Sequence, residues 1–193
     1  MARAGLTPDR ITVAAADLAD EIGFDKVTLS ALARGFGVKD ASLYSHIKNL
    51  ADLRFRVAAL AGREVHERLA AAVAGRAGKD ALTAFANTYR DFAHEHPGRY
   101  AATQIQIKLD ASAFDTPEIR RAIETPYAML RAYGLSEPDL TDAVRLLRAT
   151  FHGYFQLEAT GGFNAPRDTR ASWDRTVEAL HALLENWPHS SAD

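Results

Sequence analysis

The stretch GVKDASLYSHIKN, residues 37–49, places a glycine turn directly before a short segment in which apolar side chains recur at helical spacing. Gly37 can adopt the positive φ of a tight turn, and Val38 can fill the gap between the helices on either side of it. Leu43 and Ile47 are four residues apart, so we expect both to point into a core. The other side chains of this segment are expected to face outward: Lys39, Asp40, Ala41, Ser42, Tyr44, Ser45 and His46.

Two helices are predicted before this turn. Thr7 is a typical N-cap with Pro8 at the first helical position, and Gly23 is expected to end the helix that they begin. Thr28 is expected to begin a second short helix, which ends at the glycine turn. Together with a third short helix over residues 39–46, these elements have the spacing of a helix-turn-helix.

The distribution of charge favours a nucleic-acid partner for this segment. The whole chain has a formal net charge of -2, but residues 26–48 contain four basic residues against one acidic residue. Small side chains at the start of the third helix would let it enter the major groove, which is about 12 Å wide. The predicted DNA contacts are Thr28, Ser30, Lys39, Asp40, Ala41, Ser42, Tyr44, His46 and Lys48.

Ordinary packing is the alternative for several of these residues. Tyr44 has the character of a half-buried packing residue, and His46 that of an exposed surface residue. Asp40 is unfavourable beside DNA unless its carboxylate accepts a hydrogen bond from a cytosine amino group. Both interpretations of this surface stay open on the residue pattern alone.

The rest of the chain is also predicted to be helical, because alternating β-branched runs do not occur in it. Thr116 is the expected cap of a helix that contains Pro126, where we expect a kink. Ser136 is the expected cap of a later helix. The longest predicted helices cover residues 49–74, 136–160 and 168–187.

These elements predict an all-α fold. A three-helix helix-turn-helix head, residues 1–48, is expected to be joined by a long helix to a C-terminal helical bundle within residues 49–193. No cysteine is present, which excludes disulfides and thiolate sites. No apolar run approaches the roughly 20 residues that a membrane span needs, and the N-terminus lacks a signal-peptide h-region. We therefore expect a soluble, cytoplasmic protein.

Common catalytic and cofactor-binding motifs do not occur in the sequence, which contains no G-x-S-x-G, P-loop, G-x-G-x-x-G or H-E-x-x-H. We therefore predict no enzymatic activity and no cofactor. His94 and His96 lie two residues apart on different sides of a predicted helix, which is poor geometry for a shared metal ion. An interaction with the helix dipole is expected for them instead.

The stretch VTLSALARGFGVKDASLYSHIKNLADL, with the helix of residues 8–22, resembles the DNA-binding head of TetR-type regulators. The matching features are a Thr that opens the second helix, the Gly-Val turn, Leu-Tyr-x-His in the recognition helix and a Leu-rich helix after it. The chain departs from the family pattern with Lys39 in place of Ser, Ile47 in place of Phe and Leu50 in place of Lys. These departures concern individual phosphate contacts and leave the class of protein unchanged.

A second, shorter resemblance lies in FHGYFQLEATGGF, residues 151–163. It is similar to the Trp-His-Gly signature of one subgroup of TetR-like C-terminal domains, with Phe in place of Trp. The resemblance implies a body that dimerises through its last two long helices and encloses a small-molecule pocket. The predicted dimer contacts are Leu140, Val144, Leu147, Phe151, Trp173, Val177, Leu180 and Leu184. The predicted ligand contacts are Phe92, Tyr100, Gln104, Tyr127, Met129, His152, Tyr154 and Phe155.

Packing inside one chain is the alternative for both sets, because apolar stripes and aromatic residues serve a core equally well. Gly153 lies within a predicted helix, where glycine costs about 1 kcal/mol relative to alanine. A close approach of another helix is the expected reason for its presence.

The resemblance implies a ligand-responsive transcriptional regulator that acts as a repressor. Such a protein binds a palindromic DNA operator as a homodimer and is released by a small-molecule effector. The long helix of residues 49–74 is expected to transmit the change from the body to the head. A helical small-molecule-binding or enzymatic protein whose head binds a protein partner is the alternative.

Overall fold

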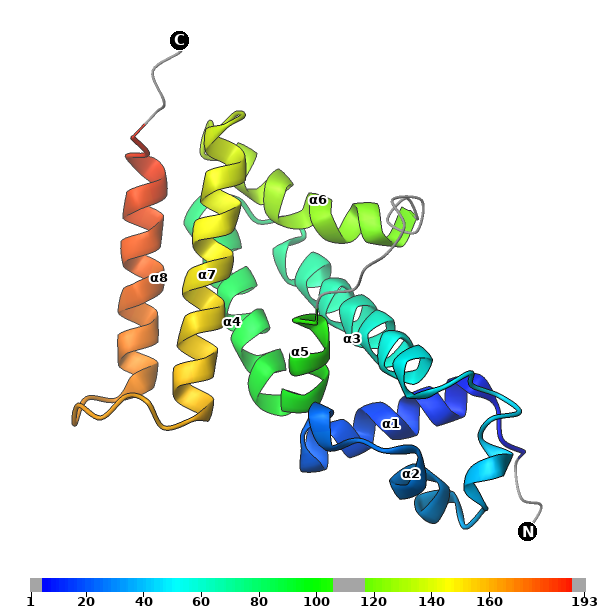
Figure 1. Cartoon of the computed structure of the whole chain (residues 1–193). Coiled ribbons are helices and arrows are strands. Elements are labelled where there is room, and N and C mark those ends of the chain that lie inside the picture. The colour runs from blue at the N-terminus through cyan, green and yellow to red at the C-terminus, as the bar shows by residue number, and fades with distance from the viewer. Residues whose placement is uncertain (1–4, 106–116, 189–193) are drawn as a thin grey trace. The chain divides into compact units, whose positions relative to one another are not determined.

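The computed structural model describes residues 5–105 and 117–188, with the backbone alone for residues 117–123. Within this described part the chain forms α-helices and 3-10 turns but no β-strand, which confirms the predicted all-α class (Figure 1). The elements are α1 (Pro8–Ile22), η1 (Phe24–Lys26), α2 (Leu29–Phe36), η2 (Asp40–Ser42), α3 (Leu50–Val73), α4 (Gly78–Glu95), α5 (Pro97–Thr103), α6 (Pro117–Arg131), α7 (Asp139–Ala159) and α8 (Thr169–Glu185).

The chain divides into two compact units. Unit 1 combines Met1–Val65 with Glu95–Ser112, and unit 2 combines His66–His94 with Ala113–Asp193. This division differs from the predicted boundary after residue 48. Unit 1 also holds the first part of α3 and the whole of α5, because both pack on the first helices.

Local signals in the sequence determine the ends of the first two helices as predicted. The Thr7 hydroxyl accepts a hydrogen bond from the Arg10 backbone N–H at 3.2 Å, and Gly23 ends α1 with a φ of 94°. The Thr28 hydroxyl accepts from the Ala31 N–H at 3.2 Å. Gly37 ends α2 in the left-handed region with a φ of 66°, where a β-carbon would be unfavourable.

The third short helix is a correction to the sequence prediction. In place of an α-helix over residues 39–46, the chain forms one 3-10 turn, Asp40–Ser42, followed by hydrogen-bonded turns. The Leu43 carbonyl accepts from the N–H groups of His46 at 2.9 Å and Ile47 at 3.0 Å. Helix formation is cooperative and needs length to propagate, which so short a segment does not supply.

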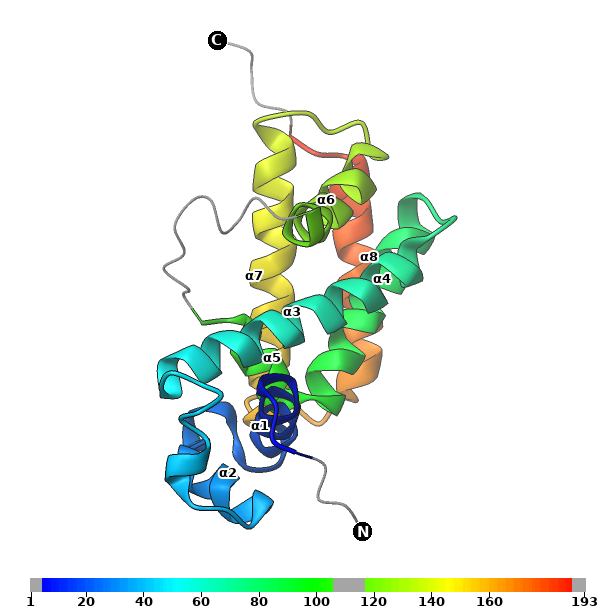
Figure 2. The ribbon, with the colours of Figure 1, turned by 90° about the vertical axis from the view of Figure 1, so that its right-hand side faces the viewer.

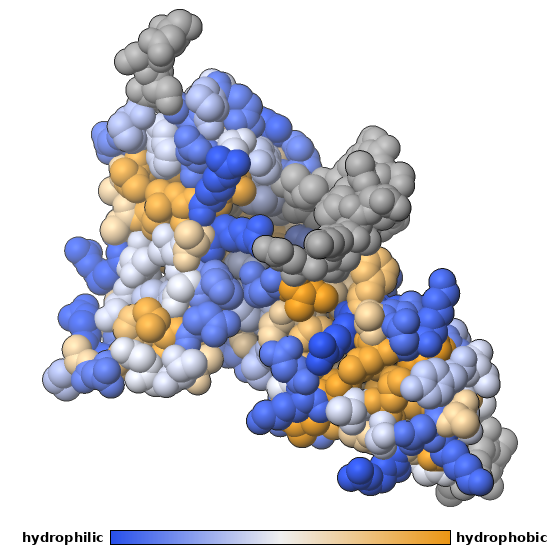
Figure 3. All heavy atoms as spheres, in the orientation of Figure 1, coloured by the Kyte–Doolittle hydropathy of each residue, from blue (hydrophilic) through white to orange (hydrophobic). Residues whose placement is uncertain are grey.

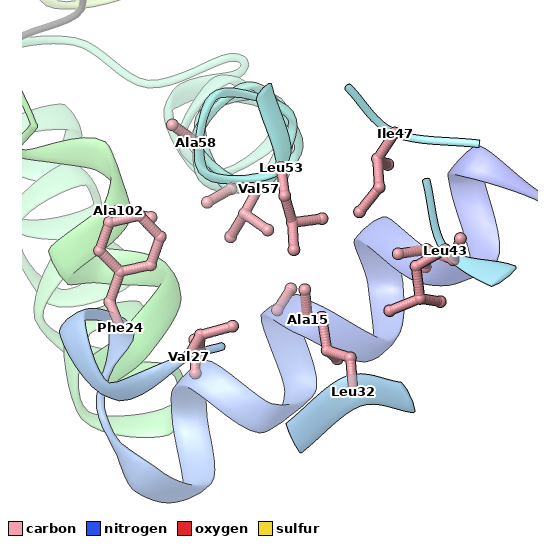
Figure 4. Close-up of a cluster of buried hydrophobic side chains, with 14 of the residues drawn as sticks. Ala15, Phe24, Val27, Leu32, Leu43, Ile47, Leu53, Val57, Ala58 and Ala102 are labelled. Atoms are coloured by element: carbon pink, nitrogen blue, oxygen red, sulfur yellow. The ribbon is translucent and has the colours of Figure 1, made fainter. Parts of the chain in front are cut away.

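Unit 1 has an apolar core that the recognition segment, residues 37–49, helps to close. Leu43 and Ile47 are 0% and 2% exposed, as predicted, and point toward α1 and Leu53 of α3 (Figure 4). Val38 packs against the same core. The segment is therefore held in place by its buried side chains more than by a continuous helical ladder.

Unit 2 is built around an aromatic cluster. Trp173 of α8 is fully buried, and its ring centroid lies 5.4 Å from that of Phe151 and 5.5 Å from that of Phe155 on α7. Its indole N–H donates to the Asn87 side-chain oxygen on α4 at 2.8 Å. The helices α7 and α8 accordingly run side by side in both views (Figures 1 and 2).

The start of α7 differs from the prediction. α7 begins at Asp139 and not directly after Ser136, and the Glu137 carboxylate accepts from the Thr141 N–H at 3.2 Å in place of a Ser136 cap. The helix α6 continues through Pro126. The predicted cap Thr116 lies outside the described residues.

A buried ion pair joins α4 to α7. The Arg90 guanidinium donates two hydrogen bonds to the Glu158 carboxylate, at 2.9 and 2.6 Å, and the Glu158 side chain is 4% exposed. His94 Nε2 lies 3.0 Å from the same carboxylate. Burial acts to raise the pKa of Glu158, but the hydrogen bonds from Arg90 and His94 outweigh it and lower this pKa below its ordinary value.

Replacing Glu158 with Gln should lower the free energy of unfolding by about 3 kcal/mol near neutral pH, because Arg90 loses its buried partner. Since the pKa of Glu158 is lower in the folded state, its contribution is present above the ordinary pKa of 4.5. The contribution is lost as the pH falls through the folded value, so the two proteins should converge in acid. Urea unfolding near neutral pH and again in acid measures this difference.

Glu178→Gln is the matched control, because its carboxylate pairs with Lys79 at 2.6 Å on the surface of the same unit. Exposed pairs contribute little, so this variant should unfold much like the wild type. Equal losses in both variants, or a Glu158 effect that is independent of pH, would contradict the assignment.

Candidate nucleic-acid interface

The recognition segment presents its polar side chains to solvent. Lys39, Ala41 and Lys48 are exposed, and Tyr44 is 56% exposed. The exposure of Tyr44 disfavours the half-buried packing role that was its alternative. His46 is half-buried. These side chains come after the Gly37 turn and lie on the surface of unit 1, whereas Leu43 and Ile47 point into its core.

Asp40 has a partner inside the chain. Its carboxylate accepts a short hydrogen bond from the Ser30 hydroxyl of α2, and both residues are exposed. This bond ties the 3-10 turn to α2 across the glycine turn. The same bond explains why the Asp40 carboxylate is compatible with an otherwise basic surface, because the carboxylate is directed toward Ser30.

The entry to α3 is ordered by a pair of side-chain caps. The Asn49 side-chain oxygen accepts from the Asp52 N–H at 2.9 Å, and the Asp52 carboxylate accepts from the Lys48 N–H at 2.9 Å. Asp52 also pairs with Arg56 at 3.2 Å. The hydrogen bond from Lys48 is the largest of the effects that lower the pKa of Asp52. The backbone that carries Lys48 is thus fixed, while its side chain is exposed.

A charged network of unit 1 joins α1, α3 and α5 around Arg99, which is 8% exposed. Its guanidinium bonds Asp17 at 2.6 Å and also bonds Asp20, and its Nε lies 3.0 Å from the Glu64 carboxylate. The Nε contact lacks hydrogen-bond alignment and is a charge contact. Burial acts to lower the pKa of Arg99, but the bonds with Asp17 and Asp20 outweigh it and raise this pKa.

The predicted ligand residues are divided between the two units. Tyr100 and Gln104 belong to unit 1, and the other six belong to unit 2. Four of the eight are buried, namely Phe92, Tyr100, Met129 and Phe155, and four are half-buried, namely Gln104, Tyr127, His152 and Tyr154.

Two of these residues have packing roles in unit 2. The Tyr154 hydroxyl donates to the Thr169 carbonyl at 2.7 Å, and its ring lies 4.9 Å from that of Trp173. Phe155 faces the same indole and stands edge-on to Tyr89 at 5.4 Å. Both side chains therefore contribute to the core that holds α7 against α4 and α8.

A cleft of about 440 Å³ lies between α3, α4 and α6 in unit 2. Its walls are mostly apolar: Ala70, Val73, Arg76, Ala77, Ala81, Glu124, Thr125, Ala128, Met129 and Ala132. Met129 is the only predicted ligand residue among these described wall residues. The sequence could not indicate the cleft, because small alanines between helices give no distinctive pattern.

The predicted dimer residues form the core of a single chain. Seven of the eight are buried within it, and Val144 is half-buried. Intramolecular packing, which the sequence left open as an alternative, is thus their environment in the structure. On α7 and α8, only the outward-facing side chains are left accessible to a partner. A β-carbon at Gly153 of α7 would meet no atom within 4 Å, so no other part of the described chain closely approaches it.

The two histidines of the HEH stretch contact different carboxylates. His94 lies beside Glu158 in unit 2, and His96 Nδ1 lies 3.0 Å from Asp20 in unit 1. His94 lies in the last turn of α4, so its predicted interaction with the helix dipole stays a prediction, whereas His96 lies beyond α4 and directly precedes α5. Among the residues that the structure describes, no group of three or more acidic or His side chains is placed to hold a metal ion. No helix in the same described ranges has the length and apolar character to cross a membrane.

Comparison with known proteins agrees with this geometry. Residues 11–57 match the bacterial regulatory proteins of the tetR family, and residues 82–180 match the tetracyclin repressor-like C-terminal domain. The chain is 36% identical to the uncharacterized HTH-type transcriptional regulator Rv0681 of Mycobacterium tuberculosis, over 94% of this chain and 83% of that protein. It is 32% identical to the uncharacterized HTH-type transcriptional regulator YobS of Bacillus subtilis, over 95% and 96% respectively.

A solved structure shares the fold at lower identity. The TetR family protein ActR of Streptomyces coelicolor, in complex with actinorhodin, superposes with a TM-score of 0.70 at 17% identity, over 97% of this chain and all of ActR. The two family matches and the two relatives, which align with more than nine-tenths of this chain, lead to one assignment. The chain belongs to the TetR family of bacterial transcriptional regulators.

Proposed function

We propose that this regulator is a ligand-responsive repressor that binds a palindromic operator as a homodimer in the cytoplasm and releases it when an effector binds. The exposed recognition segment of unit 1 is the observation that carries the proposal. Lys39, Tyr44 and Lys48 project from a segment whose apolar residues are buried. Cationic and hydroxyl groups of this kind suit phosphate contacts, and small Ala41 allows close approach to base edges.

The other predicted contacts take particular roles in this proposal. The Thr28 hydroxyl accepts from a backbone N–H and keeps its own hydrogen for a phosphate oxygen. Ser30 and Asp40 act as a pair that shapes the turn, so Asp40 contributes through Ser30 more than through a base. Ser42 and His46 lie at the edge of the surface, where both are half-buried.

Tyr44→Ala should weaken binding to the operator by about 1–3 kcal/mol, because a phosphate loses a hydrogen bond from the phenol. Tyr44→Phe should lose most of the same amount, since it removes the hydroxyl alone. Thermal unfolding should be nearly unchanged in both, because the side chain is 56% exposed. Mobility shift with a duplex selected from random DNA by the wild-type protein measures the effect. Wild-type affinity in the Ala variant would remove Tyr44 from the interface.

The homodimer is proposed to form through the outer surfaces of α7 and α8. Leu157 of α7 and Leu183 of α8 are 45% and 39% exposed. Gly153 lies one helical turn before Leu157, and Ala179 lies one turn before Leu183. Hydrophobic patches lie over these two helices (Figure 3). Apolar and small side chains together suit helix packing between copies. Two heads are needed because the half-sites of an operator are read about 34–36 Å apart.

Leu157→Asp with Leu183→Asp should convert the dimer to monomers in analytical ultracentrifugation, because charges would replace the apolar contact. Operator binding should be lost with the second head. Val13→Asp is the control, since Val13 is equally exposed at 45% but lies on α1. A dimer that persists in the double variant would place the interface elsewhere.

The cleft between α3, α4 and α6 is proposed as the effector site. Its volume of about 440 Å³ lies in the range of small-molecule pockets, and its walls are apolar with few polar groups. The ActR structure contains actinorhodin, so a member of this fold holds a small organic ligand. In this chain the effector must bind the operator-free state more tightly, which makes effector and operator weaken each other.

Ala128→Trp should reduce effector affinity by about tenfold or more, because the indole would fill the cleft. Operator binding in the absence of effector should be retained. Ala71→Trp on α3 is the control, since Ala71 is exposed and is not a wall residue. Calorimetry with an effector found by thermal-shift screening measures both. Equal affinity in the two variants would move the effector site away from this cleft.

A further inference from the structure

The helix α5 is an integral part of the core beneath the recognition segment, although about 50 residues separate the two in the chain. Ala102 is 0% exposed within that core, and Ala101 and Ile105 pack against it. Figure 4 shows Ala102 next to Phe24, which lies just after α1. Removal of α5 would open the apolar core that anchors Leu43.

The start of α5 meets the end of α1 at van der Waals distance. A β-carbon at Gly98 would overlap the backbone carbon and oxygen of Ala19. Backbone atoms cannot rotate away as a side chain can, so any larger residue must push the two helices apart. Gly98 is therefore required for this close approach, and the spacing between α1 and α5 is sensitive to one methyl group.

Polar contacts fix the orientation of this contact between the end of α1 and the start of α5, the α1–α5 joint. The residue that precedes α5, His96, supplies no side-chain cap. Asp20 of α1 acts in its place, because its carboxylate accepts from the Arg99 N–H at 2.8 Å and from the Arg99 guanidinium. Arg99 in turn reaches Asp17 on α1 and Glu64 on α3. One buried cation thus holds three helices of unit 1.

The contact between α1 and α5 also joins the two sequence segments of unit 1. Glu64 is one residue before the end of the first segment of unit 1 at Val65, and Arg99 follows Glu95, where the second segment begins. The charged network of Arg99 therefore links the two sequence segments of unit 1 to each other and to α1. Leu43 is buried in the same core as the apolar residues of α1. The placement of α1 therefore sets the position of the recognition segment.

We propose that α5 completes the DNA-binding unit, with Gly98 and Arg99 as positioning residues that set the DNA affinity of the recognition segment without touching DNA. This inference rests on the proposed operator binding. It goes further in assigning a part of the DNA-binding unit to a helix that follows α4 in the chain. The predicted head of residues 1–48 would be incomplete without it.

The test compares two glycine substitutions in helices of unit 1. Gly98→Ala should weaken operator binding by about tenfold or more, because a displaced head misaligns a set of phosphate contacts. Gly62→Ala on α3 is the matched control, since its new methyl group would meet no atom within 4 Å. Both changes favour helix by propensity, so a loss confined to Gly98 reports the clash.

Arg99→Met and Asp20→Asn test the polar half of the joint. Each should weaken binding in the same direction, and Arg99→Lys should restore part of the affinity by keeping the charge. Arg63→Met, at an exposed position of α3, removes the same charge and should bind as the wild type does. The duplex is one selected by the wild-type full chain from random DNA, and titration gives both the Kd and the fraction of active protein.

The two quantities separate the possible results. A weaker Kd with a full active fraction in Gly98→Ala, Arg99→Met and Asp20→Asn supports the positioning role. A wild-type Kd in these variants, with or without a lower active fraction, would reduce the joint to a stabilising contact and overturn the inference. Failure of the wild-type protein to select any duplex would instead overturn the proposed operator binding.

Discussion

Burial of Leu43 and Ile47 under α1 and α3 is the interaction on which the exposed recognition segment depends. The segment has a single 3-10 turn and no continuous helical ladder, so its backbone alone does not define its shape. Gly37 sets the direction in which the segment leaves α2, and the two apolar side chains anchor it to the core. Lys39 and Tyr44 then project outward as a consequence of what is buried.

The core that accepts these anchors is assembled from distant parts of the chain. Asp20 and Arg99 are 79 residues apart and form one buried contact between α1 and α5. Burial of the Arg99 charge is unfavourable unless it is paired and hydrogen-bonded, and the carboxylates of Asp17 and Asp20 meet that requirement, while Glu64 adds a charge contact. A buried ion pair is weak evidence for net stability, which is why we propose a positioning role for this network.

Unit 2 uses its apolar stripes for packing within the chain, the alternative that the sequence left open. The stripes of α7 and α8 face each other and α4, around Trp173, and leave a second, less hydrophobic surface outside. One helix can carry a core-facing stripe and an outer contact surface, because the core covers only part of the helix circumference. Leu157, Leu183 and the open space beside Gly153 lie on that second surface, through which the homodimer is proposed to form.

The sequence by itself determined the all-α class, the ends of α1 and α2, the inward positions of Leu43 and Ile47 and the family. Caps, glycine turns and apolar periodicity act between residues that are neighbours in the chain, so they can be recognised without a structure. Tertiary structure alone decided that α5 packs with the head, that Ser30 holds Asp40, and that the stripe around Phe151 is a core. It also decided where alanines leave a cleft. Each of these depends on which surfaces meet, and one helix does not specify the partner that covers it.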